Sequence, residues 1–341
     1  MTKKIFFSLI FFFILTFITL FSLEFVSRLY LYFVKNNYCA KTLNFEKYES
    51  KADDLLGYIP KKGSKIGCNG EKYTINNDGF RTYTGFNFSE SNHLIIGDSF
   101  GFGDELDDSE ALSYLLYKDY DIKNINAAVY GYGIDQMVLR ALEIIKNKKI
   151  DKVIMITSPG GAKRVNKSVR NKVKKPFFLY DGKQLVLNKP GDQKIGNSVR
   201  NSLINKSFFI RYSLTKLGMG KYLNNDEMVQ DNLPYHLKSC KILENFQEKL
   251  DNKNIKFDVV LYRDAGEIIR QKQEQKKQTD NFLQCLDKIK VKYLDTYDIL
   301  RSNKDKKLFI KYDYGHPTIV SNLIVSKYFA EYIEKAGKLW N

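Results

Sequence analysis

One stretch decides the fold: His93-Leu94-Ile95-Ile96-Gly97-Asp98-Ser99-Phe100-Gly101-Phe102-Gly103. The apolar residues before Gly97 are typical of a buried strand in a parallel sheet, and the Gly-Asp-Ser that follows is typical of a tight turn. A polar, helix-starting segment, Asp107-Asp108-Ser109, comes next. The pattern places Ser99 at the carboxyl end of a strand, the edge where open α/β sheets bind their ligands. Such turns are common, so the rest of the chain must decide whether Ser99 is a nucleophile or only a helix cap.

A histidine that could activate Ser99 lies near the C-terminus, in a Tyr-Asp-Tyr-Gly-His-Pro-Thr segment. The chain has only 3 histidines. His93 begins the strand, away from its carboxyl end, and His236 lies in an expected helix among lysines. Only His316 follows an acidic residue, Asp313, by three positions on a loop with glycine and proline. Such a loop can bring the carboxylate to one ring nitrogen while the other faces Ser99, which is the arrangement of a catalytic triad.

At these residues the sequence resembles the SGNH/GDSL hydrolase family. The first block of that family matches Gly97-Asp98-Ser99, and its last block matches Asp313-x-x-His316. Between them, Asn126-Ala127-Ala128-Val129-Tyr130-Gly131-Tyr132-Gly133 is similar to the second block. The resemblance covers residues from about 92 to 335, with an insertion.

The resemblance implies a role for each matched residue. Ser99 would be the nucleophile, His316 the base, Asp313 the carboxylate that orients the base, and Gly131 an amide donor of the oxyanion hole. It also implies a flavodoxin-like, three-layer α/β fold with a doubly wound parallel sheet, and a reaction without cofactor or metal. Further residues expected to bind substrate are Asp98, Gly160, Gly161, Arg164 and Asn166.

The third block departs from the family pattern. The family usually has Gly-x-Asn-Asp after the third strand, with the asparagine side chain as another oxyanion donor. Here the chain reads Ser158-Pro159-Gly160-Gly161-Ala162-Lys163-Arg164. Losing one such donor typically costs on the order of 10²–10³ in kcat, so activity falls but need not vanish. Donors that remain or could substitute are the amides of Ser99, Gly131, Gly160 and Gly161 and the side chain of Asn166.

The N-terminus carries a membrane-spanning signal. Residues from Ile5 to Leu23 are almost wholly apolar and follow Lys3 and Lys4, and the run is long enough to span a bilayer. No alanine or glycine precedes Ala40, so no A-x-A-like cleavage site is present. We therefore expect residues 1–36 to be an uncleaved signal anchor, with the rest of a single-pass protein on the periplasmic side. The positive-inside bias is small, because basic residues also follow the apolar run.

Strands and helices alternate through most of the remaining chain. We expect a connector and β-rich flap over residues 37–91, then a hydrolase-like domain over 92–341 with an insertion at about 160–233. Expected strands are Leu94–Gly97, Asn124–Ala128, Val153–Thr157, Phe257–Tyr262 and Lys292–Asp295. Expected helices are Asp108–Lys118, Asp135–Lys148, Leu237–Asn252, Ile268–Lys288 and Thr318–Ala336. This alternation predicts a parallel sheet of roughly five strands.

The insertion interrupts that alternation. Residues 176–187 form two apolar runs around Asp181-Gly182, which predicts a hairpin, and residues 207–214 have helical spacing. The insertion begins at the edge of the sheet where Ser99 is expected. Both a lid or substrate wall and a simple packing excursion fit this pattern.

The formal net charge of +16 is mostly scattered lysine. One cluster, from Lys163 to Lys175, holds seven cations without an intervening acid. A solvated loop and a surface that attracts anionic substrate or membrane both explain it. Nucleic acid is disfavoured, because the run lacks interleaved aromatic residues.

The cysteines suit an oxidising compartment. Cys39 and Cys68, and likewise Cys240 and Cys285, lie near each other in the sequence and could pair. Four buried free thiols fit equally well. No Cys-x-x-Cys is present, so neither zinc nor a redox motif is expected.

Two classes of function follow. The first is an ester hydrolase, or an acetyl or acyl transferase, that acts on acyl esters of envelope glycans through an acyl-Ser99 intermediate. A single span cannot carry an acyl donor across a membrane, so transfer would need a polytopic acyltransferase partner. The second class, suggested by the missing asparagine, is a catalytically weak or inactive protein that binds or helps to modify envelope polysaccharide.

Overall fold

The computed structural model describes residues 3–34, 49–67, 70–83, 86, 91–170, 173–190, 207, 209–210, 213–214, 217, 226–229, 233–310 and 315–338. The chain divides into two compact units. The first comprises Met1–Tyr48, Ile66–Glu71 and Lys194–Asn225; the second comprises Glu49–Lys65, Lys72–Gln193 and Asp226–Asn341.

A long apolar helix dominates the first unit. Helix α1 (Lys3–Leu29) runs into the π-helical turn η1 (Tyr30–Val34). By length and composition the helix can cross a membrane, a property that a signal sequence shares. Near its end, Glu24 accepts hydrogen bonds from Arg28 Nε at 2.7 Å and from Ser207 Oγ at 2.8 Å. The expected helix at 207–214 falls mostly outside the described residues.

An eight-stranded sheet forms the centre of the second unit, with the order β15-β14-β8-β6-β7-β5-β4-β3. These strands are β3 (Gly63–Ile66), β4 (Lys72–Ile75), β5 (Arg81–Thr82), β6 (His93–Gly97), β7 (Asn124–Asn126), β8 (Lys152–Thr157), β14 (Lys256–Leu261) and β15 (Lys292–Asp295). The five strands from β15 to β7 pair in parallel, as the sequence predicts. Strand β5 pairs antiparallel with both β7 and β4, so the flap strands extend the sheet instead of only covering its edge.

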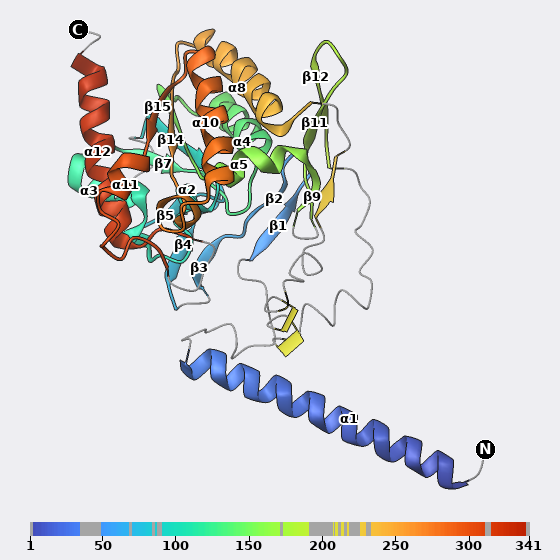
Figure 1. The fold of residues 1–341 in the computed structure, drawn as a ribbon. Coiled ribbons are helices and arrows are strands. Elements are labelled where there is room, and N and C mark those ends of the chain that lie inside the picture. Colours follow the sequence, from blue (N-terminus) through green and yellow to red (C-terminus); the bar gives the residue numbers. More distant parts are fainter. Residues whose placement is uncertain are drawn as a thin grey trace. The chain divides into compact units, whose positions relative to one another are not determined.

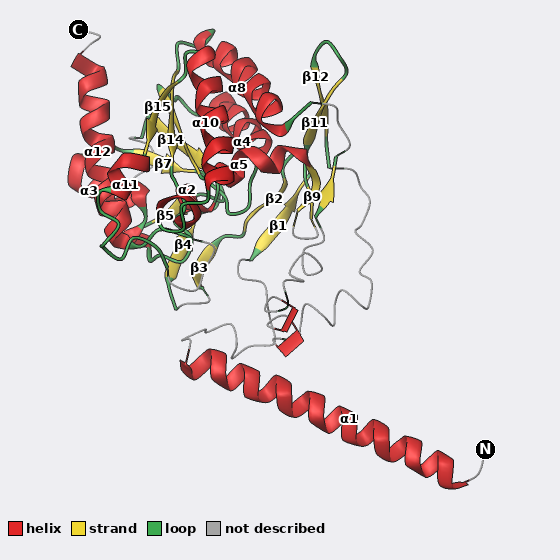
Figure 2. Ribbon diagram, viewed as in Figure 1, coloured by secondary structure: helices red, strands yellow, loops and turns green. Residues whose placement is uncertain are grey.

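Helices cover both faces of this sheet and make the predicted three layers (Figures 1 and 2). They are α2 (Ser99–Phe102), η4 (Asp108–Glu110), α3 (Leu112–Tyr120), α4 (Ile134–Asn147), α5 (Pro159–Lys163), η5 (Arg164–Asn166), α8 (Tyr235–Asp251), α9 (Ala265–Ile268), α10 (Gln273–Lys288), α11 (Tyr297–Arg301) and α12 (Ile319–Lys338). One apolar core lies between the sheet and helices α4, α8 and α10. A second lies on the other face, under α3, α11 and α12. Alternate side chains of β6 enter opposite cores, Leu94 and Ile96 the first and Ile95 the second.

Helix positions match the expected ones with two corrections. The helix expected over Asp108–Lys118 is the 3₁₀ turn η4 followed by α3, because Ala111 between them is extended. The helix expected over Ile268–Lys288 is two helices, α9 and α10. The backbone of Gln271 has φ of 51°, and the Lys272 amide donates to Gly266 O at 3.0 Å, so the chain turns here before α10 begins. The helical spacing in the sequence is carried by α10 alone.

The insertion contains small sheets and the expected hairpin. Strands β11 (Phe177–Tyr180) and β12 (Leu185–Asn188) pair antiparallel around Asp181-Gly182, which confirms the hairpin. Strands β10 (Val173–Lys174), β9 (Lys167–Arg170) and β13 (Glu227–Met228) form a separate sheet. Strands β1 (Ser50–Asp53) and β2 (Gly57–Pro60) form another antiparallel pair in the flap.

A disulfide joins two helices of one layer. Cys240 in α8 bonds to Cys285 in α10, 45 residues apart in the sequence, which decides between the two alternatives for this pair. Cys39 and Cys68 lie outside the described residues.

Candidate active site

Ser99 lies at the turn between β6 and α2. Asp98 is the N-cap of the four-residue helix, and Ser99 is its first residue, with 5% of its surface exposed. The helix ends at once, because Gly103 adopts a left-handed conformation, φ 82°, and its amide donates to Ser99 O at 3.0 Å. The serine therefore lies at the carboxyl end of a central strand.

Two glycines allow this turn to approach the neighbouring strand β8. A Cβ at Gly97 would lie 2.0 Å from Ile156 O, and one at Gly101 would lie 2.9 Å from the same oxygen. No larger residue fits Gly97 without moving backbone. The glycine of the Gly-Asp-Ser motif is thus required by packing between β6 and β8.

His316 reaches Ser99 from the other end of the chain. Its Nε2 lies 2.8 Å from Ser99 Oγ, and the residue is 8% exposed. A bridge between Phe309 and Pro317 and a hydrogen bond from Ile310 N to His316 O at 3.0 Å hold the loop. The fold thus brings together the two residues that the sequence predicts as nucleophile and base. Asp313 lies outside the described residues, so its role remains a prediction.

The loop also fits closely against α9. Gly315 has φ of 97°, and a Cβ there would lie 3.0 Å from both Ala265 Cβ and Ala265 N. Both the backbone conformation and the contact favour glycine. Glycine at position 315 therefore lets the His316 loop pack closely against α9.

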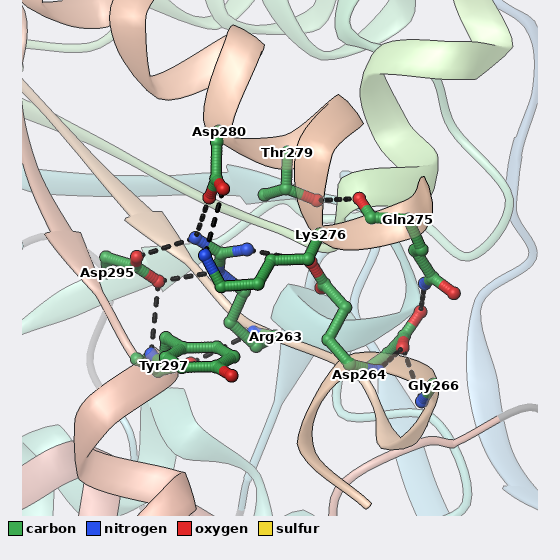
Figure 3. A network of polar contacts seen from close by, with 11 residues as sticks. Arg263, Asp264, Gly266, Gln275, Lys276, Thr279, Asp280, Asp295 and Tyr297 are labelled. Atoms are coloured by element: carbon green, nitrogen blue, oxygen red, sulfur yellow. Dashed lines mark hydrogen bonds and ion pairs between the residues drawn. The ribbon is translucent and has the colours of Figure 1, made fainter. Parts of the chain in front are cut away.

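An arginine network at the carboxyl ends of β14 and β15 holds α9 (Figure 3). Arg263 bonds both oxygens of Asp295, each at 2.7 Å, and Glu267 Oε1 at 2.7 Å. Its Nη2 also lies 3.3 Å from Asp280 Oδ1, and its guanidinium lies 5.3 Å from the Tyr297 ring centre. Burial alone would lower the pKa of Arg263, but its bonds to Asp295 and Glu267 raise it overall. No motif in the sequence indicates this network, because its acids lie on three separate elements.

Asp98, expected to bind substrate, is instead wholly buried and joins the first block to the third. Its Oδ1 accepts from Phe100 N at 3.0 Å. Its Oδ2 accepts from Ser158 N at 3.1 Å, Ser158 Oγ at 2.7 Å, Thr157 Oγ1 at 3.3 Å and Arg164 Nη1 at 3.0 Å. With so many donors and no exposed surface, this carboxylate supports the turn that carries Ser99.

Arg164 is the cation of that buried pair. Its Nη1 also donates to Tyr132 O at 3.0 Å, and its side chain is 15% exposed. Burial lowers the pKa of Arg164, while the charge of Asp98 opposes that shift. Arg164 therefore links the first, second and third blocks, in the region where the family asparagine is missing.

Gly131 occupies the turn after β7. Its φ is 77°, and the Tyr132 amide closes the turn on Val129 O at 3.3 Å. The Tyr58 hydroxyl, from β2, donates to Tyr130 O at 2.7 Å. The Tyr132 hydroxyl donates in return to Tyr58 O. A flap strand thus supports the turn that carries the expected oxyanion donor, a contact that the sequence analysis did not foresee.

The other third-block candidates fall into different places. The Gly161 amide donates to Ser158 O at 3.0 Å, so it closes the first turn of α5. Gly160 lies beside Arg164, since a Cβ there would lie 3.2 Å from Arg164 Nη2. Asn166 O accepts from Val229 N at 2.8 Å, and among the described residues no contact joins Asn166 to Ser99 or His316.

Part of the basic run is neutralised by acids of the same chain. Within its described part, four cations form ion pairs. The pairs are Arg164–Asp98 at 3.0 Å, Lys167–Asp226 at 2.5 Å, Arg170–Asp226 at 2.8 Å and Lys175–Asp135. These four residues are therefore not part of a bare solvated loop, because the neutralising acids come from distant parts of the sequence. Attraction of an anionic substrate or membrane by the run stays a prediction.

A carboxylate that the sequence analysis passed over lies beside the histidine. Asp104 Oδ2 is 3.6 Å from His316 Nε2, and Asp104 is 4% exposed. Its only sequence signal is an acidic residue five positions after Ser99. Among the described residues, no group of three or more histidine, cysteine or acidic side chains could hold a metal ion.

No protein-family model matches the chain, and no curated protein matches it. Solved structures are similar to it at low identity. One is a member of the lipolytic G-D-S-L family from Veillonella parvula, at 8% identity and TM-score 0.41, covering 69% of this chain and 93% of that one.

Two further similar structures are esterases. A psychrotrophic esterase from Pseudoalteromonas, inhibited by monoethylphosphonate, has 15% identity and TM-score 0.42 over 74% of this chain and 100% of its own. A catalytic mutant of an acetylxylan esterase from Geobacillus stearothermophilus has 13% identity and TM-score 0.41 over 71% and 94%. What those proteins act on is a property of those proteins, and likeness at this level does not transfer it.

Proposed function

We propose that this chain is a serine ester hydrolase of the SGNH/GDSL type. The observation that carries the proposal is the 2.8 Å contact between Ser99 Oγ and His316 Nε2, two buried groups 217 residues apart. A hydroxyl hydrogen-bonded to an imidazole at the ligand-binding edge of an α/β sheet is the arrangement of an activated nucleophile. A simple helix cap would not need the histidine.

The first half of the reaction would form an acyl-serine. Ser99 Oγ attacks the carbonyl carbon of the ester while its proton moves to His316 Nε2. The tetrahedral intermediate then expels the alcohol oxygen, which takes that proton from the imidazolium. The acyl group remains on Ser99, and the histidine returns to its neutral form.

The second half would release the acyl group. An incoming hydroxyl gives its proton to Nε2 as its oxygen attacks the acyl carbon, and Ser99 leaves with the proton returned from the imidazolium. Water as the acceptor gives hydrolysis, and a sugar hydroxyl gives acyl transfer. Asp313, three residues before His316, would accept a hydrogen bond from the other ring nitrogen.

The oxyanion would be stabilised by main-chain amides. We assign the amides of Ser99 and Gly131 to this role, with Gly160 as a third donor. Gly161 is set aside because its amide bonds Ser158 O. Arg164 lies between these segments and would hold them in register.

The setting we propose is the outer side of a bacterial membrane. Helix α1 would anchor the protein, and the catalytic domain would lie in the periplasm. The Cys240–Cys285 disulfide supports this, because disulfides persist in oxidising compartments. Acetyl or short acyl esters on envelope glycans are the proposed substrates, and transfer would require a polytopic acyltransferase partner. The alternative is a protein that binds or helps to modify envelope polysaccharide without efficient catalysis, which the missing asparagine favours.

A fluorophosphonate probe on the detergent-solubilised full chain tests the proposal. We expect covalent labelling of the peptide that contains Ser99, located by mass spectrometry, and none in Ser99→Ala. Ser109→Ala, an exposed serine ten residues on, is the matched control and should label normally. Absence of labelling at every pH tried would favour the glycan-binding alternative. If Ser99 is labelled, release of acetate from envelope glycans by the protein would identify its substrate.

Asp313→Asn tests the third member of the triad. The carboxylate orients the imidazole and stabilises the imidazolium but forms no bond to substrate, so kcat should fall by less than in His316→Ala. An unchanged kcat across the whole pH range would remove Asp313 from the mechanism.

A further inference from the structure

Asp104 is held rigidly on the turn that carries the nucleophile. Its amide donates to Ser99 O at 2.9 Å, beside the Gly103 amide at 3.0 Å. Arg81, a buried flap residue, donates to Phe102 O at 2.9 Å and also to Gly103 O. Five residues after the serine, the backbone of Asp104 is therefore fixed relative to Ser99.

The carboxylate of Asp104 faces the nitrogen that takes part in the chemistry. Its Oδ2 lies 3.6 Å from His316 Nε2, the same atom that lies 2.8 Å from Ser99 Oγ. This separation is too long for a hydrogen bond but within the range of an ion pair with a charged ring. All three residues are buried, so solvent screens this interaction weakly.

We propose that Asp104 is a positioning residue for His316, a second carboxylate that stabilises the imidazolium from the Nε2 side. The catalytic consequence rests on the proposed function, whereas the effect on the ring itself does not. When Nε2 takes the proton of Ser99, the new positive charge forms beside Asp104. The carboxylate gains no proton and only supplies the opposite charge.

His316 and its loop also contact uncharged groups of two helices. Helix α2 contributes the Phe100 ring, 5.4 Å away between centroids, and α9 contributes Ala265, which packs against Gly315. Arg81 is a cation that contacts the Asp104 turn. Its guanidinium forms an ion pair with Asp108 at 3.1 Å and donates to backbone oxygens, among them Phe102 O. From its own loop, Asp313 is expected at the opposite ring nitrogen.

The sign of the effect follows from the charge. A negatively charged carboxylate within about 4–6 Å favours the protonated, positively charged imidazole, so Asp104 should raise the pKa of His316. The base must be neutral to accept the serine proton, so the acid limb of kcat/KM reports this pKa in the free protein. Removing the carboxylate should move that limb to lower pH and should also lower the maximal rate.

Imidazole titration by NMR tests the inference directly. The chain has 3 histidines, so histidine labelled with ¹³C gives few signals, and loss of one in His316→Gln assigns it. In the full chain in detergent micelles, Asp104→Asn should lower the pKa of His316 by about one unit. Asp119→Asn, which removes an exposed carboxylate on α3, should not. His93, at the start of β6, serves as an internal reference.

Two outcomes would overturn the inference, and a third would separate it from the proposed function. An unchanged His316 titration in Asp104→Asn overturns the inference, even if the variant loses activity, because that loss would reflect structure alone. If Asp104→Asn unfolds, Asp104→Glu keeps the charge and should retain a raised pKa, whereas Asp104→Ser should lose it; equal titrations in the two would also overturn it. A shifted titration in a chain that never labels with fluorophosphonate would sustain this inference while the proposed function failed.

Discussion

Two arginines at the same edge of the sheet, Arg263 buried and Arg164 partly buried, are held in opposite ways. Arg263 follows β14 and bonds carboxylates on three elements, Glu267, Asp280 and Asp295. Arg164 follows the neighbouring strand β8 and bonds one carboxylate, Asp98, and one carbonyl oxygen. Their pKa values move in opposite directions, upward for Arg263 and downward for Arg164.

Arg263 therefore stabilises the fold, whereas Arg164 connects the segments that form the site. Arg263 joins β14, β15, α9 and α10, and its charge is more than matched by acids (Figure 3). Arg164 joins only the three segments around Ser99, and burial outweighs its single counter-charge. We expect loss of Arg263 to reduce stability, and loss of Arg164 to reduce activity more than stability.

The largest effect should come from removing the nucleophile, Ser99, which lies on one of the segments that Arg164 connects. Ser99→Ala and His316→Ala should each reduce kcat on a small ester by roughly 10⁴-fold or more, and the double variant should lose little beyond that, because such residues act as a unit. The melting temperature should stay within a few degrees of the parent. Comparable turnover in Ser99→Ala and the parent would show that Ser99 is not the nucleophile. Arg164 would then have no catalytic site to support.

Arg263→Met should give the largest loss of stability. It leaves Glu267 buried without its cation, and removing one partner of a buried pair typically costs about 3–5 kcal/mol. The midpoint of thermal unfolding, followed by circular dichroism, should fall by roughly 10 °C. Activity per folded molecule should change little.

The same variant should respond to pH with a defined sign. Burial raises the pKa of Glu267, while Arg263 opposes that shift. Without Arg263 the folded-state pKa of this acid rises further above its unfolded value, so stability is lost as pH rises through that window. The destabilisation should therefore be larger at pH 7.5 than at pH 5, and an equal loss at both would assign it to packing.

The Cys240–Cys285 disulfide is a second bond to α10, the helix that Arg263 contacts through Asp280. Cys240→Ser together with Cys285→Ser opens a 45-residue separation and should cost about 2–4 kcal/mol of unfolding free energy. Since the bond joins α8 to α10 and touches none of the residues around Ser99, kcat should be unchanged. A large fall in kcat at full folding would show that this layer also positions the site.

Arg164→Met is the matched counterpart of Arg263→Met. Asp98 keeps four other donors, from Phe100, Thr157 and Ser158, so the loss of stability should be smaller, about 1–2 kcal/mol. The Ser99 and Gly131 turns lose their common partner, and small misplacements at a reacting centre can cost on the order of 10²-fold. We expect kcat/KM to fall about 10- to 100-fold. Equal stability losses in the two methionine variants, with normal kcat/KM in Arg164→Met, would show that both arginines only stabilise the fold.

Lys167→Gln should have the smallest effect. Lys167 and Arg170 share Asp226 at a partly exposed site, and such pairs contribute about 0–1 kcal/mol. Because Asp226 already neutralises this part of the basic run, the KM for an anionic ester should not become less sensitive to salt. Kinetics at low and high ionic strength, with a neutral ester as control, would check this.

Local patterns in the sequence predicted much of this protein. Apolar runs bounded by turns located the strands β6, β8 and β14, because burial on both faces of a sheet demands continuous apolar residues. The regular alternation of strands with helices located β7 and β15. The same logic located the Asp181-Gly182 hairpin. The approach of Ser99 to His316 followed from where strands end and from the scarcity of histidine, without knowledge of any contact.

Tertiary structure alone decided which charges meet. A lysine that is solvated and one that is buried against an acid read alike in the sequence, so the run from Lys163 to Lys175 looked cationic until the fold brought Asp98, Asp135 and Asp226 to it. For the same reason the sequence could not indicate that Asp104 faces His316 Nε2 or that Arg263 joins four elements. Hydrophobic periodicity is a local property of the chain, whereas an ion pair depends on the distance between residues that only folding makes neighbours.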